Sequence, residues 1–134
     1  MSIRLYFKHF STNYYNSEQR AHRMLGVKLK NTLKATVLAQ LTGRYAKIPA
    51  DSRPVIIDFT FFSTHKYDVD NYSAMVKYIQ DCLVFRGILQ DDNQKIIGEC
   101  RIRVKPITNE SREGCLIRFM PNSEIVFPDD EINF

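Results

Sequence analysis

The chain has 134 residues, of which 44% are hydrophobic and 25% are charged, and its formal net charge is +4. This length is sufficient for one domain with a core of its own, so disulfide or zinc staples are not required. No apolar run approaches the length of a bilayer span and the N-terminus lacks a signal-peptide pattern, so we expect a cytoplasmic protein with no membrane contact.

The N-terminal part predicts a strand followed by one long amphipathic helix. Apolar and polar residues alternate over residues 3–7, which is typical of a strand, and a polar loop follows. Ser17 is the expected N-cap of the helix, apolar residues recur at helical spacing as far as Leu41, and Gly43 supplies a stop.

This part of the chain is also strongly basic. Residues 1–50 contain nine Lys or Arg against one acid, a balance of +8, whereas residues 51–134 contain ten basic and fourteen acidic residues, a balance of −4. The asymmetry indicates a candidate surface for a polyanion. A solvated, lysine-rich helix face is an equally good explanation.

A buried strand and a second helix follow. Residues 55–62 are β-branched and aromatic, which predicts a well-buried strand. Asp70 is expected to cap a helix over residues 71–85, and Gly87 is expected to end it. We also expect Phe85 to lie in the core.

Two further strands are predicted, over residues 96–104 and 115–120. The order strand, helix, strand, helix, strand, strand indicates a single small α/β (α+β) domain spanning residues 1–134, with a mixed β-sheet packed against two main helices. Residues 128–134 are expected to form a flexible acidic tail.

Cysteine and histidine give no sign of a metal or redox site. The three cysteines are odd in number and widely spaced, which argues against disulfides and predicts reduced core or strand residues: Cys82, Cys100 and Cys115. The three histidines are scattered and lack the spacing of zinc ligands, so zinc is not expected: His9, His22 and His65.

Two pairs of aspartates bracket the second helix: Asp68 and Asp70 before it, and Asp91 and Asp92 after Gly87. Crowded carboxylates repel unless a cation lies between them, and Mg²⁺ prefers oxygen ligands. A helix of this length spans about 22 Å, so the pairs can share a site only if the chain after Gly87 doubles back. A helix cap and a turn explain the same residues without a metal.

The residues around this helix follow a longer pattern, which reads in chain order Asp68-Val69-Asp70-Asn71, Lys77, Asp81-Cys82-Leu83, Gly87 and Asp91-Asp92-Asn93-Gln94. It resembles the signature of the RusA family of Holliday junction resolvases, D-x-D-N, a lysine, D-x-L, a glycine and D-D-x-Q. The segment covers about a fifth of the chain. Residues 72–76 make the spacing before Lys77 about three residues longer than the family pattern.

The resemblance implies a Mg²⁺-dependent endonuclease, with Mn²⁺ as a substitute and no small-molecule cofactor. It would act as a homodimer in DNA recombination and repair, cutting two opposed strands of a four-way junction in a bacterial cell or phage-infected host. Carried over by position, Asp68, Asp70 and Asp92 would be the catalytic, metal-binding carboxylates. Asp91 would lie close to the metal, and Lys77 would assist at the scissile phosphate unless the extra residues turn it elsewhere.

On this interpretation the basic residues of the N-terminal part would hold the DNA backbone: Arg20, Arg23, Lys30, Lys34, Arg44 and Lys47. Tyr14 and Tyr15 could stack on unpaired bases at a crossover.

Two alternatives stay open. The chain could be a branched-DNA-binding or partner-recruiting protein that keeps the same scaffold without cutting, which the longer spacing before Lys77 would favour. In addition, residues 129–134 are similar to the acidic, Phe-terminated tip by which bacterial single-stranded-DNA-binding proteins recruit partners.

Overall fold

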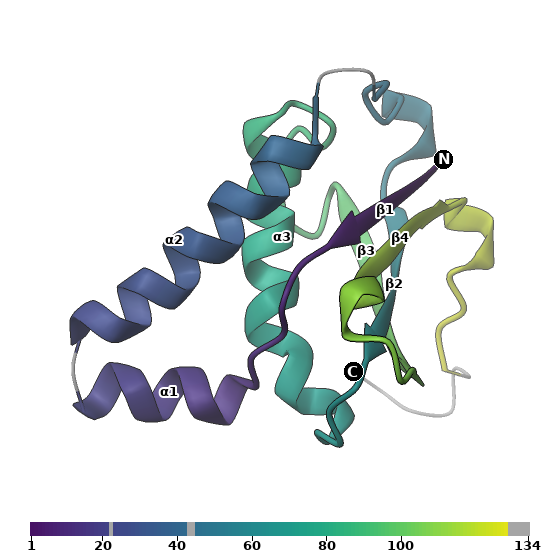
Figure 1. Ribbon diagram of the computed structural model, residues 1–134. Coiled ribbons are helices and arrows are strands. Elements are labelled where there is room, and N and C mark those ends of the chain that lie inside the picture. The colour runs from purple at the N-terminus through teal and green to yellow at the C-terminus, as the bar shows by residue number, and fades with distance from the viewer. Residues whose placement is uncertain (22, 43–44, 129–134) are drawn as a thin grey trace.

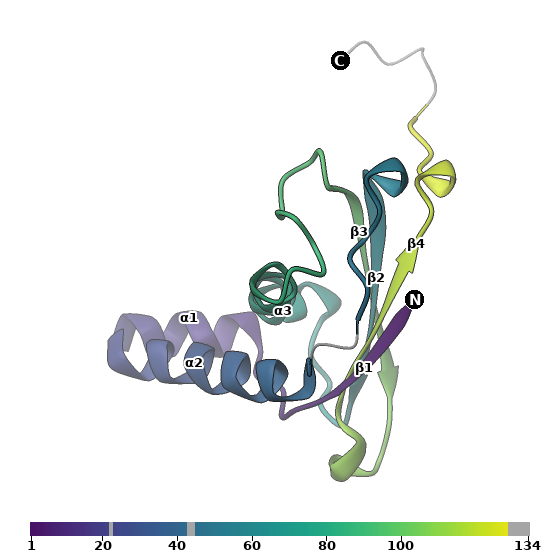
Figure 2. The ribbon, with the colours of Figure 1, turned by 90° about the horizontal axis from the view of Figure 1, so that it is seen from above.

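Four strands form one sheet, and the helices cover one of its faces (Figures 1 and 2). The computed structural model describes residues 1–21, 23–42 and 45–128. The strands are β1 (Ser2–Tyr6), β2 (Val55–Ser63), β3 (Ile97–Pro106) and β4 (Gly114–Met120). The helices are α1 (Thr12–Ala21), α2 (Arg23–Gln40) and α3 (Ser73–Phe85), and a short 3₁₀ helix, η2 (Val69–Tyr72), leads into α3.

The strands lie in the order β1-β4-β2-β3. β4 is antiparallel to both β1 and β2, whereas β2 and β3 are parallel. This arrangement confirms the expectation of a single small α+β domain with a mixed sheet and two main helices, α2 and α3. Among the described residues, no helix is both long enough and apolar enough to cross a membrane.

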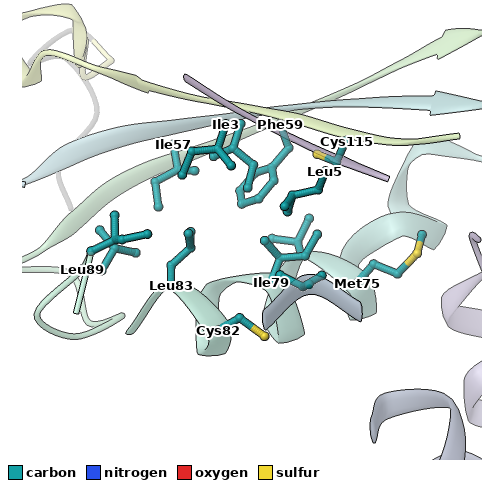
Figure 3. Packing of buried hydrophobic residues seen from close by; sticks show 14 of the residues in the cluster. Ile3, Leu5, Ile57, Phe59, Met75, Ile79, Cys82, Leu83, Leu89 and Cys115 are labelled. Atoms are coloured by element: carbon teal, nitrogen blue, oxygen red, sulfur yellow. The ribbon is translucent and has the colours of Figure 1, made fainter. Parts of the chain in front are cut away.

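The core lies between the sheet and α3. Met75, Ile79 and Leu83 recur every four residues along α3, and each is fully buried. Figure 3 shows Ile79 and Leu83 facing Ile57 and Phe59 of the central strand β2. Burial of each such side chain contributes about 1.5–3 kcal/mol, so this row fixes α3 on the sheet and sets which side chains α3 presents to solvent.

The prediction of one helix beginning at Ser17 is wrong. Ser17 lies inside α1, and the chain reverses between α1 and α2, which lie side by side (Figure 2). Residues 17–23 contain no large apolar side chain, so nothing in them fixes a continuous helix along the protein. Tyr15 instead anchors α1 by stacking on Phe10, with 5.9 Å between ring centroids. The expected stop, Gly43, lies outside the described residues.

The prediction that Asp70 caps the second helix is also wrong. Asp70 lies within η2, and Tyr72 occupies the N-cap position of α3 without a side-chain capping bond. The buried ring of Tyr72 makes the packing contacts that hold this turn, with 4.9 Å between its centroid and that of Phe61. The residues between Asp70 and Lys77 are thus divided between a 3₁₀ turn and the first turn of α3.

The predicted end of α3 at Gly87 is confirmed. Gly87 has φ +75°, and the N–H groups of Gly87 and Ile88 donate to the carbonyls of Val84 and Leu83 at 2.9 and 3.0 Å. This is the Schellman pattern of helix termination. Phe85 is 73% exposed, against expectation, because it is the last residue of the helix and lies beyond the buried row.

All three cysteines are free, in keeping with the prediction of reduced thiols. Cys82 and Cys115 are buried, whereas Cys100 is an exposed residue of β3.

Candidate functional site

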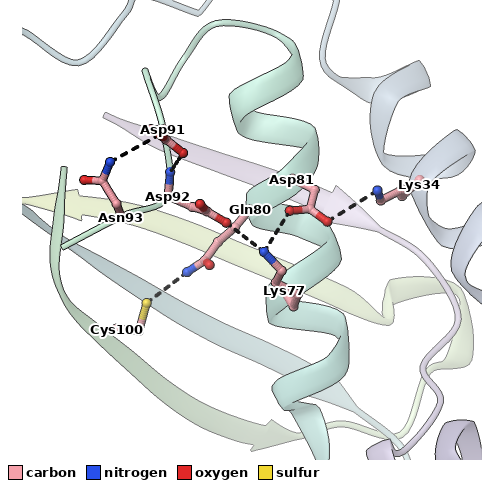
Figure 4. Close-up of polar contacts among 8 residues, drawn as sticks. All are labelled: Lys34, Lys77, Gln80, Asp81, Asp91, Asp92, Asn93 and Cys100. Carbon is pink, nitrogen blue, oxygen red and sulfur yellow. Dashed lines mark hydrogen bonds and ion pairs between the residues drawn. The ribbon is translucent and has the colours of Figure 1, made fainter. Parts of the chain in front are cut away.

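A chain of alternating charges links α2, α3 and the loop after α3 (Figure 4). The Lys77 ammonium donates to Asp92 Oδ2 at 2.8 Å and lies 3.2 Å from Asp81 Oδ1. The other oxygen of Asp81 lies 3.3 Å from the Lys34 ammonium. These four residues form a row of ion pairs that places Lys77, the lysine of the motif, beside Asp92, its closing aspartate.

The chain after Gly87 doubles back along α3, which brings Asp92 to Lys77. Ile88 and Leu89 are buried and anchor the returning segment against the core. Lys77 lies about 12 Å before the end of the helix at 1.5 Å per residue, so the loop returns by about two turns. Asp92 therefore lies beside the first half of α3, the half that follows Asp70.

Asp91 forms the turn itself. Its carboxylate accepts hydrogen bonds from the Asp92 backbone N–H at 2.7 Å and from Asn93 Nδ2 at 3.2 Å. Asn93 Oδ1 in turn accepts from the Lys95 N–H at 2.9 Å. These contacts are those expected of an aspartate that shapes a turn.

Asp68 and Asp70 lie at the other end of the motif. Both are exposed, Asp68 immediately before η2 and Asp70 within it. Across the described ranges, no group of three or more His, Cys, Asp or Glu side chains is placed to hold a metal ion. Carboxylates are nevertheless the donors that Mg²⁺ takes, commonly one or two of them with water and substrate phosphate completing its shell.

The contact between Lys77 and Asp92 shifts both titrations. Hydrogen bonds to Asp92 and then to Asp81 raise the pKa of Lys77, and the hydrogen bond from Lys77 lowers the pKa of Asp92. Because the pKa of Asp92 in the folded state lies below its ordinary value, the contact stabilises the fold at pH values above the ordinary carboxyl pKa. This stabilisation is lost as the pH falls through the lowered pKa.

Replacing Lys77 by methionine is expected to raise the pKa of Asp92 toward the ordinary carboxyl value, because its main charged partner is removed. Carboxyl carbon chemical shifts of Asp92, followed by NMR between pH 2 and 7, would measure this change. Lys34→Met is the matched control, since Lys34 contacts Asp81 and should leave Asp92 unchanged. An unchanged Asp92 titration in Lys77→Met would contradict the ion pair.

The residues predicted to hold phosphates fall into two groups. The exposed ones are Arg20, Arg23 and Lys47. Lys30 and Lys34 are half-buried, and their ammonium groups lie 5.6 and 5.7 Å from the ring centroid of Tyr78. Lys34 also pairs with Asp81, so its charge is partly neutralised. Arg44 lies outside the described residues.

The two tyrosines predicted to stack on bases differ in exposure. The hydroxyls of Tyr15 and Tyr78 are hydrogen-bonded at 2.8 Å, and the Tyr15 ring packs on Phe10. Tyr14 is 50% exposed. Of this pair, Tyr14 presents its ring to solvent.

The face of the sheet opposite the helices carries several arginines that sequence reasoning missed as a group. Arg4 lies over the rings of Tyr6 and Phe62, 4.2 and 4.3 Å from their centroids. Arg103 donates to Asp58 Oδ2 at 2.6 Å from the neighbouring strand. The alternation of Arg101 and Arg103 was the available signal, because alternate residues of a strand share one face.

Arg103→Ala is expected to lower the free energy of unfolding by about 2 kcal/mol, the cost of a buried acceptor that loses its hydrogen bond. Asp58 is 1% exposed, and its other oxygen has no hydrogen-bond partner among the described residues, so the variant leaves a buried carboxylate unpaired. Urea denaturation would measure the loss. Arg101→Ala is the matched control and should cost less, because its partner Glu99 is partly exposed. Equal losses would show that the burial of Asp58 is not the cause.

Comparison of the chain with protein-family models finds no match, and comparison with curated proteins finds none either.

Proposed function

We propose that the protein is a metal-dependent endonuclease that hydrolyses phosphodiester bonds at four-way DNA junctions, working as a homodimer in the cytoplasm of a bacterial cell or phage-infected host. The observation that carries this proposal is the 2.8 Å contact between Lys77 and Asp92. These residues are the lysine and the closing aspartate of the RusA-like motif, and they lie 15 residues apart in sequence. The longer spacing before Lys77 therefore does not turn this lysine away from the closing aspartate of the motif.

The residue types suit hydrolysis of a phosphodiester. Asp68, Asp70 and Asp92 carry the oxygen donors that Mg²⁺ prefers, although the structure does not gather the three into one group. A bound Mg²⁺ would activate water and neutralise charge on the phosphate. Asp92 and Asp81 hold Lys77 protonated, and its ammonium would bind a non-bridging phosphate oxygen and stabilise the added charge of the transition state. Lys77 is 58% exposed, so substrate can reach it.

The homodimer follows from the reaction. Paired cuts in two opposed strands need two reactive centres related by symmetry, and each chain carries one copy of the motif. Basic residues on the exposed parts of α1 and α2 would hold the junction arms.

A labelled four-way junction, a linear duplex and a flap, each incubated with Mg²⁺ or with EDTA, would test the proposal. We expect paired symmetric cuts in the junction that require Mg²⁺ and no comparable cutting of the duplex. Tight junction binding without cutting in either Mg²⁺ or Mn²⁺ would overturn it.

That second outcome would favour a branched-DNA-binding protein that does not cut. Two observations favour this alternative: Asp91 is engaged in a turn, and the described residues contain no group of three or more carboxylate, thiol or imidazole side chains placed to hold a metal ion.

A further inference from the structure

A hollow of about 810 Å³ opens beside the N-terminal helices. Its floor is apolar, because Phe7, Phe10 and Leu33 line it and are each at most 7% exposed. Tyr14 and Tyr67 supply aromatic side chains at its walls. The hollow can therefore take a flat, apolar group of several rings' width.

The charges at the hollow have one sign. Of the described residues that line it, Lys8 and Lys28 are the charged ones, both are exposed, and none is a carboxylate. An occupant with an apolar part and an anionic part would match the floor and these lysines together. A nucleotide has both parts, a base and a phosphate.

The hollow also adjoins the first residue of the motif, Asp68. Tyr67 lines it and immediately precedes Asp68. The Tyr67 ring is held in place by stacking on His65, with centroids 4.8 Å apart and planes 7° from parallel. A base bound in the hollow would thus bring its own phosphate toward Asp68, the first residue of the motif.

A second copy of the chain is a weaker occupant. Symmetric pairing through this face would bring the basic side chains at the hollow, Lys8 and Lys28, toward the same basic side chains of the second copy. Like charges repel across such an interface, whereas a polyanion is attracted to them.

We propose that the hollow receives an unpaired base of the DNA substrate, with Lys8 and Lys28 binding the adjoining phosphates. This inference rests on the proposed function, since it names what the nuclease recognises: a nucleotide that is unstacked at the branch point. A fully paired duplex offers no such base, so the hollow would favour junctions over duplex.

Fluorescence of 2-aminopurine placed at the branch point of a four-way junction tests the inference, with the full chain carrying Asp70→Asn so that no strand is cut. We expect the emission to change on binding, and Tyr14→Ala and Thr32→Trp to remove that change and weaken junction binding about tenfold. Thr32 is an exposed residue that lines the hollow, so a tryptophan there would fill it. Binding to linear duplex should be unchanged in both variants.

Phe127→Ala is the matched control, because Phe127 is an aromatic residue, 82% exposed, that does not line the hollow. Unaltered emission, or equal weakening on junction and duplex, would overturn the inference. The inference would also be overturned if sedimentation showed that Tyr14→Ala and Thr32→Trp dissociate a dimer while the 2-aminopurine emission still changes on binding. If the emission changes but the wild type does not cleave the junction, the nuclease proposal is refuted and base binding in the hollow is supported. If the wild type cleaves the junction but the emission does not change, base binding in the hollow is refuted and the nuclease proposal is supported.

Discussion

Asp92→Asn is expected to abolish junction cleavage, with a loss of at least about 10³-fold in the cleavage rate, while junction binding persists. The substitution removes one carboxylate charge offered to a metal ion and weakens the hold on Lys77, and it preserves the shape of the side chain. Single-turnover cleavage of a labelled junction in Mg²⁺, with binding measured separately in EDTA, would give both quantities.

Asp81→Asn is the matched control for this variant. Asp81 contacts the same ammonium at 3.2 Å and also pairs with Lys34, but it lies outside the proposed set of metal-binding carboxylates. We expect Asp81→Asn to keep most of the cleavage activity. Equal losses in the two variants would mean that both aspartates act only by holding Lys77, and Asp92 would then lose its proposed role at the metal.

Much of the fold could be predicted because local pattern and tertiary packing agree over β2 and α3. The β-branched and aromatic run of β2 needs burial on a sheet, and the apolar row of α3 together with Gly87 defines both the buried face and the end of that helix. The break between α1 and α2 could not be predicted in this way. The spacing of apolar residues before and after residue 22 is compatible with one continuous helix as well as with two helices. Contacts between residues distant in sequence, such as the hydrogen bond between Tyr15 and Tyr78, favour two helices.

The order of residues in the motif can be read from the sequence, but the contacts between them could not be predicted. The order of the motif identifies Lys77 and Asp92, but the length of α3 alone would keep them apart, and only the buried anchors Ile88 and Leu89 turn the loop back. Asp91 could be assigned to a turn or to a metal from sequence, and its two hydrogen bonds within the loop place it in the turn. The hollow had no sequence signal, because it is lined by segments that are far apart along the chain.

Among the glycines compared here, an added methyl group is expected to cost the most stability at Gly114, the first residue of β4. Gly114 has φ +151°, and a Cβ there would lie 1.9 Å from the Leu5 carbonyl oxygen and 2.8 Å from Arg4 Nη1. The carbonyl belongs to β1, the strand paired with β4, so neither side can move without disturbing the ladder. Gly114→Ala should lower the free energy of unfolding by about 4 kcal/mol, from backbone strain and overpacking together, and Tm by about 14 °C.

Gly87→Ala is the matched control, because it introduces the backbone strain of a positive φ without a steric clash of the added Cβ. Gly87 also has positive φ, +75°, but an added Cβ would meet only Lys47 Cε, at 3.7 Å. This variant should therefore cost about 1–2 kcal/mol, the penalty of a left-handed conformation alone. Urea denaturation of both variants beside the wild type gives the difference. A Gly114→Ala loss no larger than that of Gly87→Ala would mean that β1 can yield at Leu5, and the close approach of β1 to β4 would not be the reason for glycine at position 114.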